Sequence, residues 1–310
     1  MKVYRATGWW LAAMALTIML LGSGCGDDNE TEPTPVYWSR VSSSTNRSLH
    51  GIDAVSSTDV WAVGDFGNFV HYDGQNWGVR LTTFTNDLFC IDMLSSSRGW
   101  AGGGGGIVYR YDGAEWTRVD QTLTANNLYG CHFSSDTQGW FVGDDGTVLQ
   151  YDEGTWVLHE TPSTKRLWGV YVPSGGDGWA CGEKGTILRY RNGVWELVNS
   201  PTSRDLYDLE YFGSDNVRVC GDGGTLVRIS GGTVGILDIQ TTQLLSAVWF
   251  FNDSHGWVAT GKGSLFHYVG GTWTKGGYQH RTGLNDLSFV DSDLGFACGD
   301  GGTILKYEYQ

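Results

Sequence analysis

A repeat of 39 to 40 residues is the sequence feature that most constrains the fold. Seven anchor leucines mark it, spaced 39, 40, 39, 39, 39 and 39 residues apart: Leu49, Leu88, Leu128, Leu167, Leu206, Leu245 and Leu284. Each unit holds four short stretches rich in β-branched and aromatic residues, separated by Gly, Asp, Asn and Ser turns. Four strands in about 40 residues are typical of a β-propeller blade. The sequence therefore predicts an all-β fold, a seven-bladed β-propeller with four antiparallel strands per blade.

The two ends of the repeat region complement each other. The seventh unit stops at Gln310, before its fourth strand, whereas Trp38 precedes the first anchor by the same 11 residues that separate Trp77 from the second. We therefore predict that the segment 37–42 pairs beside Tyr307 and completes the last blade. Such closure would leave no open ring and would protect the strand edges.

Three aromatic columns recur at fixed offsets from the anchors. They are Trp61, Trp100, Trp140, Trp179, Arg218, Trp257 and Phe296; Tyr72, Tyr111, Tyr151, Tyr190, Ile229, Tyr268 and Tyr307; and Trp77, Trp116, Trp156, Trp195, Val234 and Trp273. The spacing predicts cross-strand pairs between the last two columns. The fifth unit departs from all three columns together, which indicates a shared environment. Burial in the core is the favoured interpretation, and stacking against sugars is the alternative.

The N-terminus has the layout of a secretory signal peptide. Lys2 and Arg5 precede an apolar run over 9–21, and small residues follow before Cys25. A cysteine at that position resembles the bacterial lipoprotein signal, in which the cysteine is lipidated; the alternative is an ordinary signal peptide. We expect a signal peptide over 1–24, a lipidated Cys25 with an acidic tether over 25–36, and the propeller over 37–310.

Charge limits the partner. Removal of 1–24 takes away Lys2 and Arg5, so the formal net charge moves from −14 to −16. Nucleic-acid binding depends on a positive surface that displaces counterions. The sequence therefore argues against a nucleic-acid partner.

The repeated Gly-Trp-x-x-Gly and Gly-Thr-x-x-x-Tyr patterns, as in 139–156, resemble those of bacterial BNR-like propellers. Over residues 38–310 the chain is similar to the photosystem II assembly and stability-factor type. This resemblance implies a seven-bladed scaffold without known catalysis. The Asp-box of sialidases places Asp five residues before Trp, whereas Asp73 precedes Trp77 by four, so the motif is shortened.

Two columns are expected at one rim of the ring, where interblade connections lie. One is acidic: Asp65, Asp144, Glu183, Asp222 and Asp300. These residues would form an acidic rim or would serve only the backbone geometry of Asp-Gly turns. The other directly follows the anchors as His50, Phe89, Tyr129, Trp168 and Tyr207, and ends with Ser246 and Asn285. With Arg166, Arg204 and Arg281 from adjoining loops, its aromatic part is our candidate partner-binding patch; packing between blades is the alternative.

Two further sets carry weaker expectations. A mostly basic column, His71, Arg110, Gln150, Arg189, Arg228, His267 and Lys306, is interpreted as a solvated strand face. Cys181, Cys220 and Cys298 share one offset and are expected to be small buried residues. Cys90 and Cys131 differ by one in offset and are therefore expected to face opposite ways.

These features lead to two hypotheses of function. The first is a non-catalytic, lipid-anchored, extracytoplasmic scaffold in the periplasm or on the surface of a bacterium, a monomer that docks a protein partner on one propeller face. The second is a carbohydrate-binding or glycoside-hydrolysing, sialidase-like propeller, which would need two facing carboxylates. We find no catalytic, metal-binding or cofactor motif, and expect no cofactor, no metal and no enzymatic activity.

Overall fold

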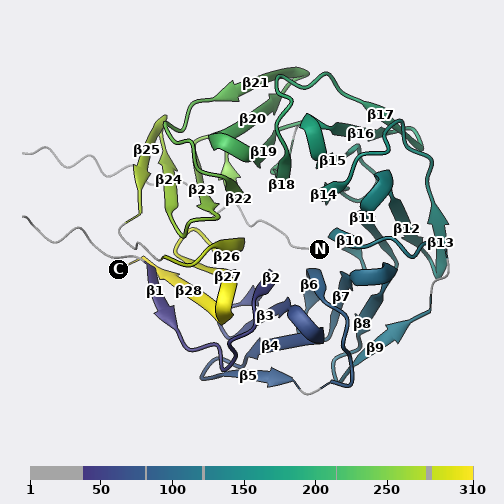
Figure 1. Cartoon of the computed structure of the whole chain (residues 1–310), viewed down its shortest axis with the longest axis vertical. Helices are drawn as coiled ribbons and strands as arrows, with labels where there is room; N and C mark the ends of the chain where they lie inside the picture. The colour runs from purple at the N-terminus through teal and green to yellow at the C-terminus, as the bar shows by residue number, and fades with distance from the viewer. Residues whose placement is uncertain (1–37, 81, 121–122, 214, 277–280, 310) are drawn as a thin grey trace, which may run out of the picture.

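Seven four-stranded sheets surround a central axis in the computed structural model of the chain (Figure 1). The structure describes residues 38–309 except 81, 121–122, 214 and 277–280. The predicted seven-bladed propeller with four antiparallel strands per blade is therefore confirmed. The predicted signal peptide, Cys25 and the tether lie outside the described residues.

Each blade is a meander whose first strand lies nearest the axis and whose last strand lies outermost (Figure 1). Blades 1 to 4 consist of β2 (Leu49–Ser56), β3 (Asp59–Gly64), β4 (Asn68–Tyr72) and β5 (Trp77–Arg80); β6 (Leu88–Ser95), β7 (Arg98–Gly103), β8 (Val108–Tyr111) and β9 (Trp116–Val119); β10 (Leu128–Ser135), β11 (Gln138–Gly143), β12 (Val148–Asp152) and β13 (Thr155–Leu158); and β14 (Leu167–Tyr171), β15 (Gly178–Gly182), β16 (Ile187–Arg191) and β17 (Val194–Leu197). Blades 5 and 6 consist of β18 (Leu206–Tyr211), β19 (Val217–Gly221), β20 (Thr225–Ser230) and β21 (Thr233–Leu237); and β22 (Leu245–Asn252), β23 (His255–Thr260), β24 (Leu265–Val269) and β25 (Thr272–Lys275).

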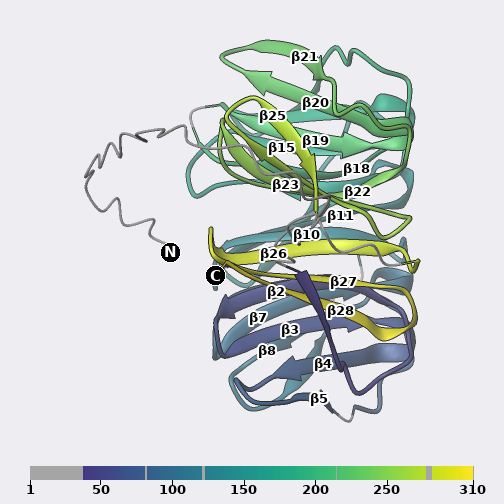
Figure 2. The same cartoon turned by 90° about the vertical axis from the view of Figure 1, so that its left-hand side faces the viewer.

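Blade 7 combines the two ends of the chain. It consists of β26 (Leu284–Asp291), β27 (Leu294–Gly299), β28 (Thr303–Glu308) and β1 (Trp38–Val41). β1 runs antiparallel to β28, with Trp38 opposite Tyr307, and the two strands lie side by side in Figures 1 and 2. The predicted ring closure is confirmed for Trp38–Val41. Residue 37 lies outside the described part.

Short 3-10 turns connect the second and third strands of six blades, over Asp65–Gly67, Gly104–Gly106, Asp144–Gly146, Glu183–Gly185, Asp222–Gly224 and Asp300–Gly302. The last residue of each turn is a glycine, and its backbone conformation and surroundings explain why glycine recurs there. Gly146 has φ +69°, and a Cβ there would lie 1.8 Å from the carbonyl oxygen of Ser163 in the next interblade loop. Only glycine permits both this backbone conformation and this close approach. The turns and interblade loops therefore share one face, called the upper face below.

The predicted cross-strand pairs are present. Tyr72 lies opposite Trp77 and Ile229 opposite Val234, as the column spacing requires. Trp61, Trp100 and the fully buried Trp257 belong to hydrophobic clusters that fill the space between neighbouring blades. These aromatic residues form the interblade core, which explains why the repeat retains them.

In blade 5 a charged side chain occupies the buried position that tryptophan occupies in most other blades. Arg218 replaces the tryptophan and is 1% exposed, with its guanidinium lying 5.0 and 5.1 Å from the ring centres of Phe212 and Phe250. It also forms an ion pair with Asp253 of blade 6. Burial lowers the pKa of Arg218, and Asp253 opposes that shift. A buried charge therefore replaces an aromatic side chain because its counterion comes from the next blade.

One expectation from column position is wrong, and another has a consequence across a seam. The basic column is not simply a solvated face: Arg110 binds Asp136 and Arg189 binds Asp215, in each case across an interblade seam. Cys90 and Cys131 do project from opposite faces of their strands, and this brings them together across the seam, since Cys131 packs against the cluster that contains Cys90. Neighbouring blades stack face to face, so opposite faces of successive strands meet. All five cysteines within the described residues are free.

Among the described residues, no helix has both the length and the apolar character that crossing a lipid bilayer requires.

The closure of the ring gives a stability prediction. Trp38 is 1% exposed and packs edge-on against Trp257 and Phe289, with ring centres 5.5 and 5.8 Å apart. Trp38→Ala should lower the free energy of unfolding by about 3 to 5 kcal/mol, measured by urea denaturation, because it removes a large buried side chain at the closing strand. Ser39→Ala, on the exposed side of the same strand, is the control. Equal stability of the two variants would contradict the closing role of Trp38.

Candidate functional site

An arc of aromatic side chains surrounds the mouth of the central channel on the upper face. The members directly follow the anchor leucines on the innermost strands of blades 1 to 5: His50, Phe89, Tyr129, Trp168 and Tyr207. All five line the axial cavity of about 450 Å³ and are half-buried. Ser246 and Asn285 hold the same position in blades 6 and 7 and also line it. The mouth therefore has an aromatic side and a polar side.

The members of the arc stack on one another. Ring centres lie 5.7 Å apart between His50 and Phe89 and 4.9 Å apart between Phe89 and Tyr129. The Arg166 guanidinium then lies 5.1 Å from the ring centre of Tyr129 and 5.7 Å from that of Trp168. Trp168 in turn packs against Tyr207. Arg166 thus joins the two aromatic halves through cation–π contacts, and the arc continues across five blades.

The acidic rim fixes the arc in place. His50 Nε2 lies 2.7 Å from an Asp65 oxygen, and the Tyr129 hydroxyl donates to Asp144 at 3.4 Å. Asp144 also pairs with Arg166 at 2.6 Å. These acids therefore have local partners, so they form a support for the arc more than an open ring of charge.

Blades 5 and 7 follow the same pattern. The Asn285 amide lies 3.3 Å from Asp300, and the Tyr207 hydroxyl lies near the Asp222 carboxylate. Burial and the nearby carboxylates raise the pKa of Tyr207 to about 12, so its hydroxyl stays protonated. Blade 2 has Phe89, which cannot hydrogen-bond, and its rim position is Gly104. In blades 1, 3, 5 and 7 an acid thus occurs at the rim beside an arc position that has a polar group, and this pairing of two columns was visible in the sequence, whereas in blade 6 the rim residue beside Ser246 is Gly261.

The three predicted arginines do not act together. Arg166 lies within the arc, as described above. Arg204 is exposed and donates to the carbonyl oxygens of Asp222 and Gly223, so it fastens its own rim turn. Arg281 is exposed and is not among the residues that line the channel. The candidate patch is therefore smaller than the sequence suggested.

The sequence analysis missed a set of carboxyl groups inside the channel. Asp208 and Asp286 accept backbone N–H groups of the next blade, from Val248 and Ile52, each at 2.8 Å. Asp53 and Asp92 lie two residues further along their innermost strands, on the same face. They accept the backbone N–H groups of Met93 and Phe133 in the next blade, at 2.7 and 2.6 Å. The innermost strands are thus linked across seams by side chains. An acid inside an apolar strand was the signal that could have revealed them.

Burial perturbs two of these groups. The pKa of Asp208 is raised to about 7 because burial disfavours its charge more than the two backbone N–H groups stabilise it. Burial also raises the pKa of Asp286, and the nearby carboxyl of Asp208 adds to this. Both residues are half-buried and line the axial cavity, and their carboxyl groups accept backbone N–H groups of the next blade. Both are structural links rather than free acids.

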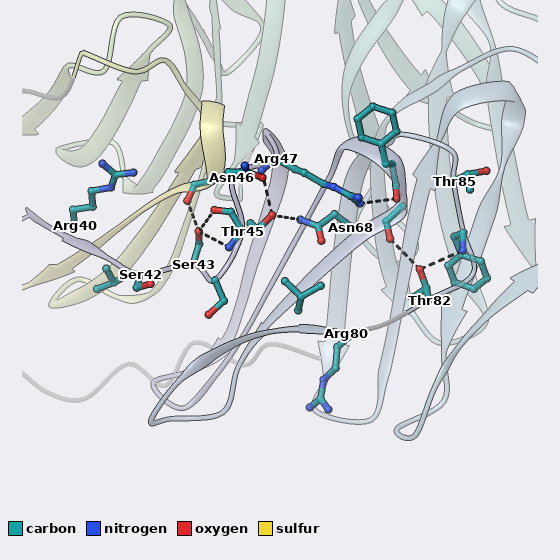
Figure 3. A pocket seen from close by; sticks show the side chains of 17 residues that line it. Arg40, Ser42, Ser43, Thr45, Asn46, Arg47, Asn68, Arg80, Thr82 and Thr85 are labelled. Atoms are coloured by element: carbon teal, nitrogen blue, oxygen red, sulfur yellow. Dashed lines mark hydrogen bonds between the residues drawn. The ribbon is translucent and has the colours of Figure 1, made fainter.

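A larger groove of about 1160 Å³ lies on the same face at the junction of blades 7, 1 and 2 (Figure 3). Its described lining includes Arg40, Arg47 and Arg80 and no acidic residue. Its polar groups hold the junction together: Arg47 donates to the Phe66 carbonyl, and the Thr82 hydroxyl donates to that of Gly67. These hydrogen bonds join the two interblade loops that flank blade 1 to the 3-10 turn of that blade, beside the strand that closes the ring.

Within the described residues, no group of three or more His, Cys, Asp or Glu side chains is arranged to hold a metal ion.

Comparison with known proteins agrees with the resemblance found in the repeat. A sequence model of the family described as photosynthesis system II assembly factor YCF48 matches residues 29–152. The resemblance is confirmed over those residues. No curated protein sequence matches the chain.

Solved structures with the same fold include a YCF48 described as bound to a D1 peptide and a YCF48 from Cyanidioschyzon merolae. The first is 16% identical, with a TM-score of 0.75, covering 88% of this chain and 96% of the other. The second is 18% identical, with a TM-score of 0.73, covering 88% and 99%. A virginiamycin B lyase from Staphylococcus aureus is 15% identical, with a TM-score of 0.77, covering 88% and 99%. At these identities the likeness shows the fold alone, and it includes an enzyme.

The buried carboxyls predict an unusual dependence of stability on pH. The pKa of Asp208 is raised in the folded state, so its contribution is fully present below about pH 4 and is lost as the pH rises through about 7. The free energy of unfolding should therefore fall by up to roughly 1.4 kcal/mol per pH unit between these limits. Asp208→Asn should flatten that slope, measured by urea denaturation at pH 4 to 8.

Asp112→Asn is the matched control. Backbone N–H groups of Glu115 and Ala114 lower the pKa of Asp112, so its contribution is lost only as the pH falls through that lowered value. This variant should keep the wild-type slope above pH 5. An unchanged slope in Asp208→Asn would show that the Asp208 carboxyl does not carry the effect.

Proposed function

We propose that the chain is a non-catalytic docking scaffold that binds a protein partner through the aromatic arc on its upper face. The observation that carries this proposal is the arc itself: five half-buried aromatic rings at the mouth of a channel, joined by the exposed guanidinium of Arg166. Aromatic residues and arginine are enriched where protein interfaces gain most of their affinity. A pre-stacked arc also loses little side-chain entropy when a partner binds.

The asymmetry of the mouth supports a single orientation for the partner. Apolar and aromatic groups occupy the side formed by blades 1 to 5, whereas Ser246 and Asn285 form the polar side. The rim acids have local partners, which reduces the electrostatic cost of docking on an acidic chain. A partner segment that places an apolar side chain over the arc and a polar group toward Ser246 would match this surface.

The comparisons support docking of a peptide segment. A YCF48 of the same fold is described as bound to a D1 peptide. This chain shares the scaffold and the family match over 29–152. The proposal takes from that relative only the mode of binding, namely a peptide held by a propeller.

Carbohydrate binding is the second candidate, because Trp168 and Tyr207 present adjoining half-exposed rings beside the channel. Hydrolysis of glycosides is less well supported. The carboxyls of Asp53, Asp92 and Asp208 each accept backbone N–H groups, so they serve the seams rather than a substrate. Wild-type binding on a glycan array, lost in Trp168→Ala, would favour the carbohydrate function over protein docking.

Loss of the arc should weaken partner capture. In native membranes, Tyr129→Ala combined with Trp168→Ala should reduce quantitative photo-crosslinking to the partner about 30-fold or more, as expected when interface hot spots worth 2 kcal/mol or more are removed. Tyr309→Ala, which removes a ring 61% exposed at the end of the last strand, is the control. An unchanged set of captured proteins in the double variant would mean that the arc is not the docking surface.

We further propose that the scaffold is held extracytoplasmically by a lipid on Cys25. The support is the sequence of the N-terminal segment. Cys25→Ala should release the mature chain from the membrane fraction into the soluble extracytoplasmic fraction, because the lipid can no longer be attached. Mass spectrometry of the mature N-terminal peptide provides the measurement, and Ser39→Ala should remain with the membrane. An N-terminal peptide without lipid in the wild type would contradict the anchor.

A further inference from the structure

Cys90 and Cys131 meet across the seam between blades 2 and 3. Cys90 is the second residue after its anchor on β6, and Cys131 is the third residue after its anchor on β10. Cys90 is buried, Cys131 is half-buried, and both line the axial channel. Cys131 packs on the hydrophobic cluster of which Cys90 is a member. The two thiols are therefore neighbours on a surface that small molecules can reach.

The geometry of this contact recurs around the ring. In blades 5 and 7, Asp208 and Asp286 hold the position of Cys90, and their carboxyl oxygens lie 2.8 Å from the backbone nitrogens at the position of Cys131 in the next blade. In blade 1, a Cβ built on Gly51 would lie 3.3 Å from the nitrogen of Ile91, its partner in blade 2. A side chain at the second position thus projects onto the third residue of the next blade.

The same geometry holds in blade 4, where a Cβ on Gly169 would lie 3.2 Å from the nitrogen of Leu209. A disulfide requires Cβ atoms about 3.5 to 4.5 Å apart. The repeat therefore places the side chain of Cys90 against the backbone of Cys131, and the two thiols are in contact with each other.

We propose that Cys90 and Cys131 form a redox-active disulfide site that clips blades 2 and 3 beneath the aromatic arc. Its reaction partner is a disulfide donor. The bridge would fasten a seam that Asp92 and the Arg110–Asp136 ion pair hold through side chains. It would also lie next to Phe89 and Tyr129, which stack on each other directly above it. This site does not depend on what the arc binds.

The chemistry is thiol–disulfide exchange. The Cys131 thiolate attacks one sulfur of the donor and displaces a first donor thiolate; the Cys90 thiolate then attacks the Cys131 sulfur and displaces the second. Two cysteine thiols are oxidised to one disulfide, the donor disulfide is reduced to two thiols, and the two protons pass to them. Burial, the adjacent Cys90 thiol and nearby aspartates raise the pKa of Cys131, so the bridge should form faster at higher pH.

Peptide mapping tests the proposal on the full-length chain. The probe is cystamine, a disulfide small enough for the channel, applied to the folded reduced protein at pH 8.5. Trypsin then releases peptide 81–98 with Cys90 and peptide 119–165 with Cys131. We expect these two peptides to be joined under non-reducing conditions. Cys181 and Cys220, which share one offset in adjacent blades, should stay unlinked and provide the internal control.

A thermal measurement accompanies the mapping. The bridge should raise the melting temperature of the wild type by roughly 5 to 10 °C, and dithiothreitol should reverse the rise. Cys131→Ser should abolish both the joined peptide and the rise. If that variant does not fold, the wild-type map alone decides. Peptides that carry only cysteamine or remain unmodified at pH 8.5, or a Cys90 joined to another cysteine, would overturn the proposal.

Discussion

Face-to-face stacking of neighbouring blades is the constraint on which the rest of the structure depends. Because successive blades present opposite faces to a seam, a side chain on one strand meets the residue at the next position along the following strand. Asp208 reaches the nitrogen of Val248 in this way, and Asp92 reaches that of Phe133. The same geometry brings Cys131 against Cys90, and the Arg110–Asp136 ion pair crosses the same seam further from the axis.

The seams are thus joined by side chains, since main-chain ladders end at the edges of each four-stranded sheet. Buried aromatic columns provide most of the contact area, and polar links specify how the blades align. Within blade 7, the main-chain ladder between β1 and β28 connects the two ends of the chain. That ladder completes blade 7, so blade 7 can offer Asp286 to Ile52 of blade 1 and close the ring.

The parts of the molecule that repeat could be predicted from the sequence. Blade number, strand pairing, the closing strand at Trp38 and the buried aromatic columns all follow from one period, because each blade solves the same packing problem. The links across seams could not be read from columns taken one at a time. Cys90 and Cys131 stand at different offsets, as do Asp208 and the residue that it binds, Val248, and each of these contacts depends on the angle between blades. A column taken alone indicates one environment, whereas each contact across a seam joins residues of two columns.

In the candidate site too, a single column predicts the aromatic arc, whereas the role of the rim acids depends on contacts between two columns. The arc was predicted from a single asymmetric column, and the structure places its members together at the channel mouth. The acidic rim has a different role from an open ring, because Asp144 holds Tyr129 and Arg166, and Asp65 holds His50. Where the arc residue is Phe89, the rim residue is Gly104. In blades 1, 3 and 7 the polar group at the mouth therefore has a partner on the adjoining turn, and this pairing fixes the orientation of the side chains available to a docked protein.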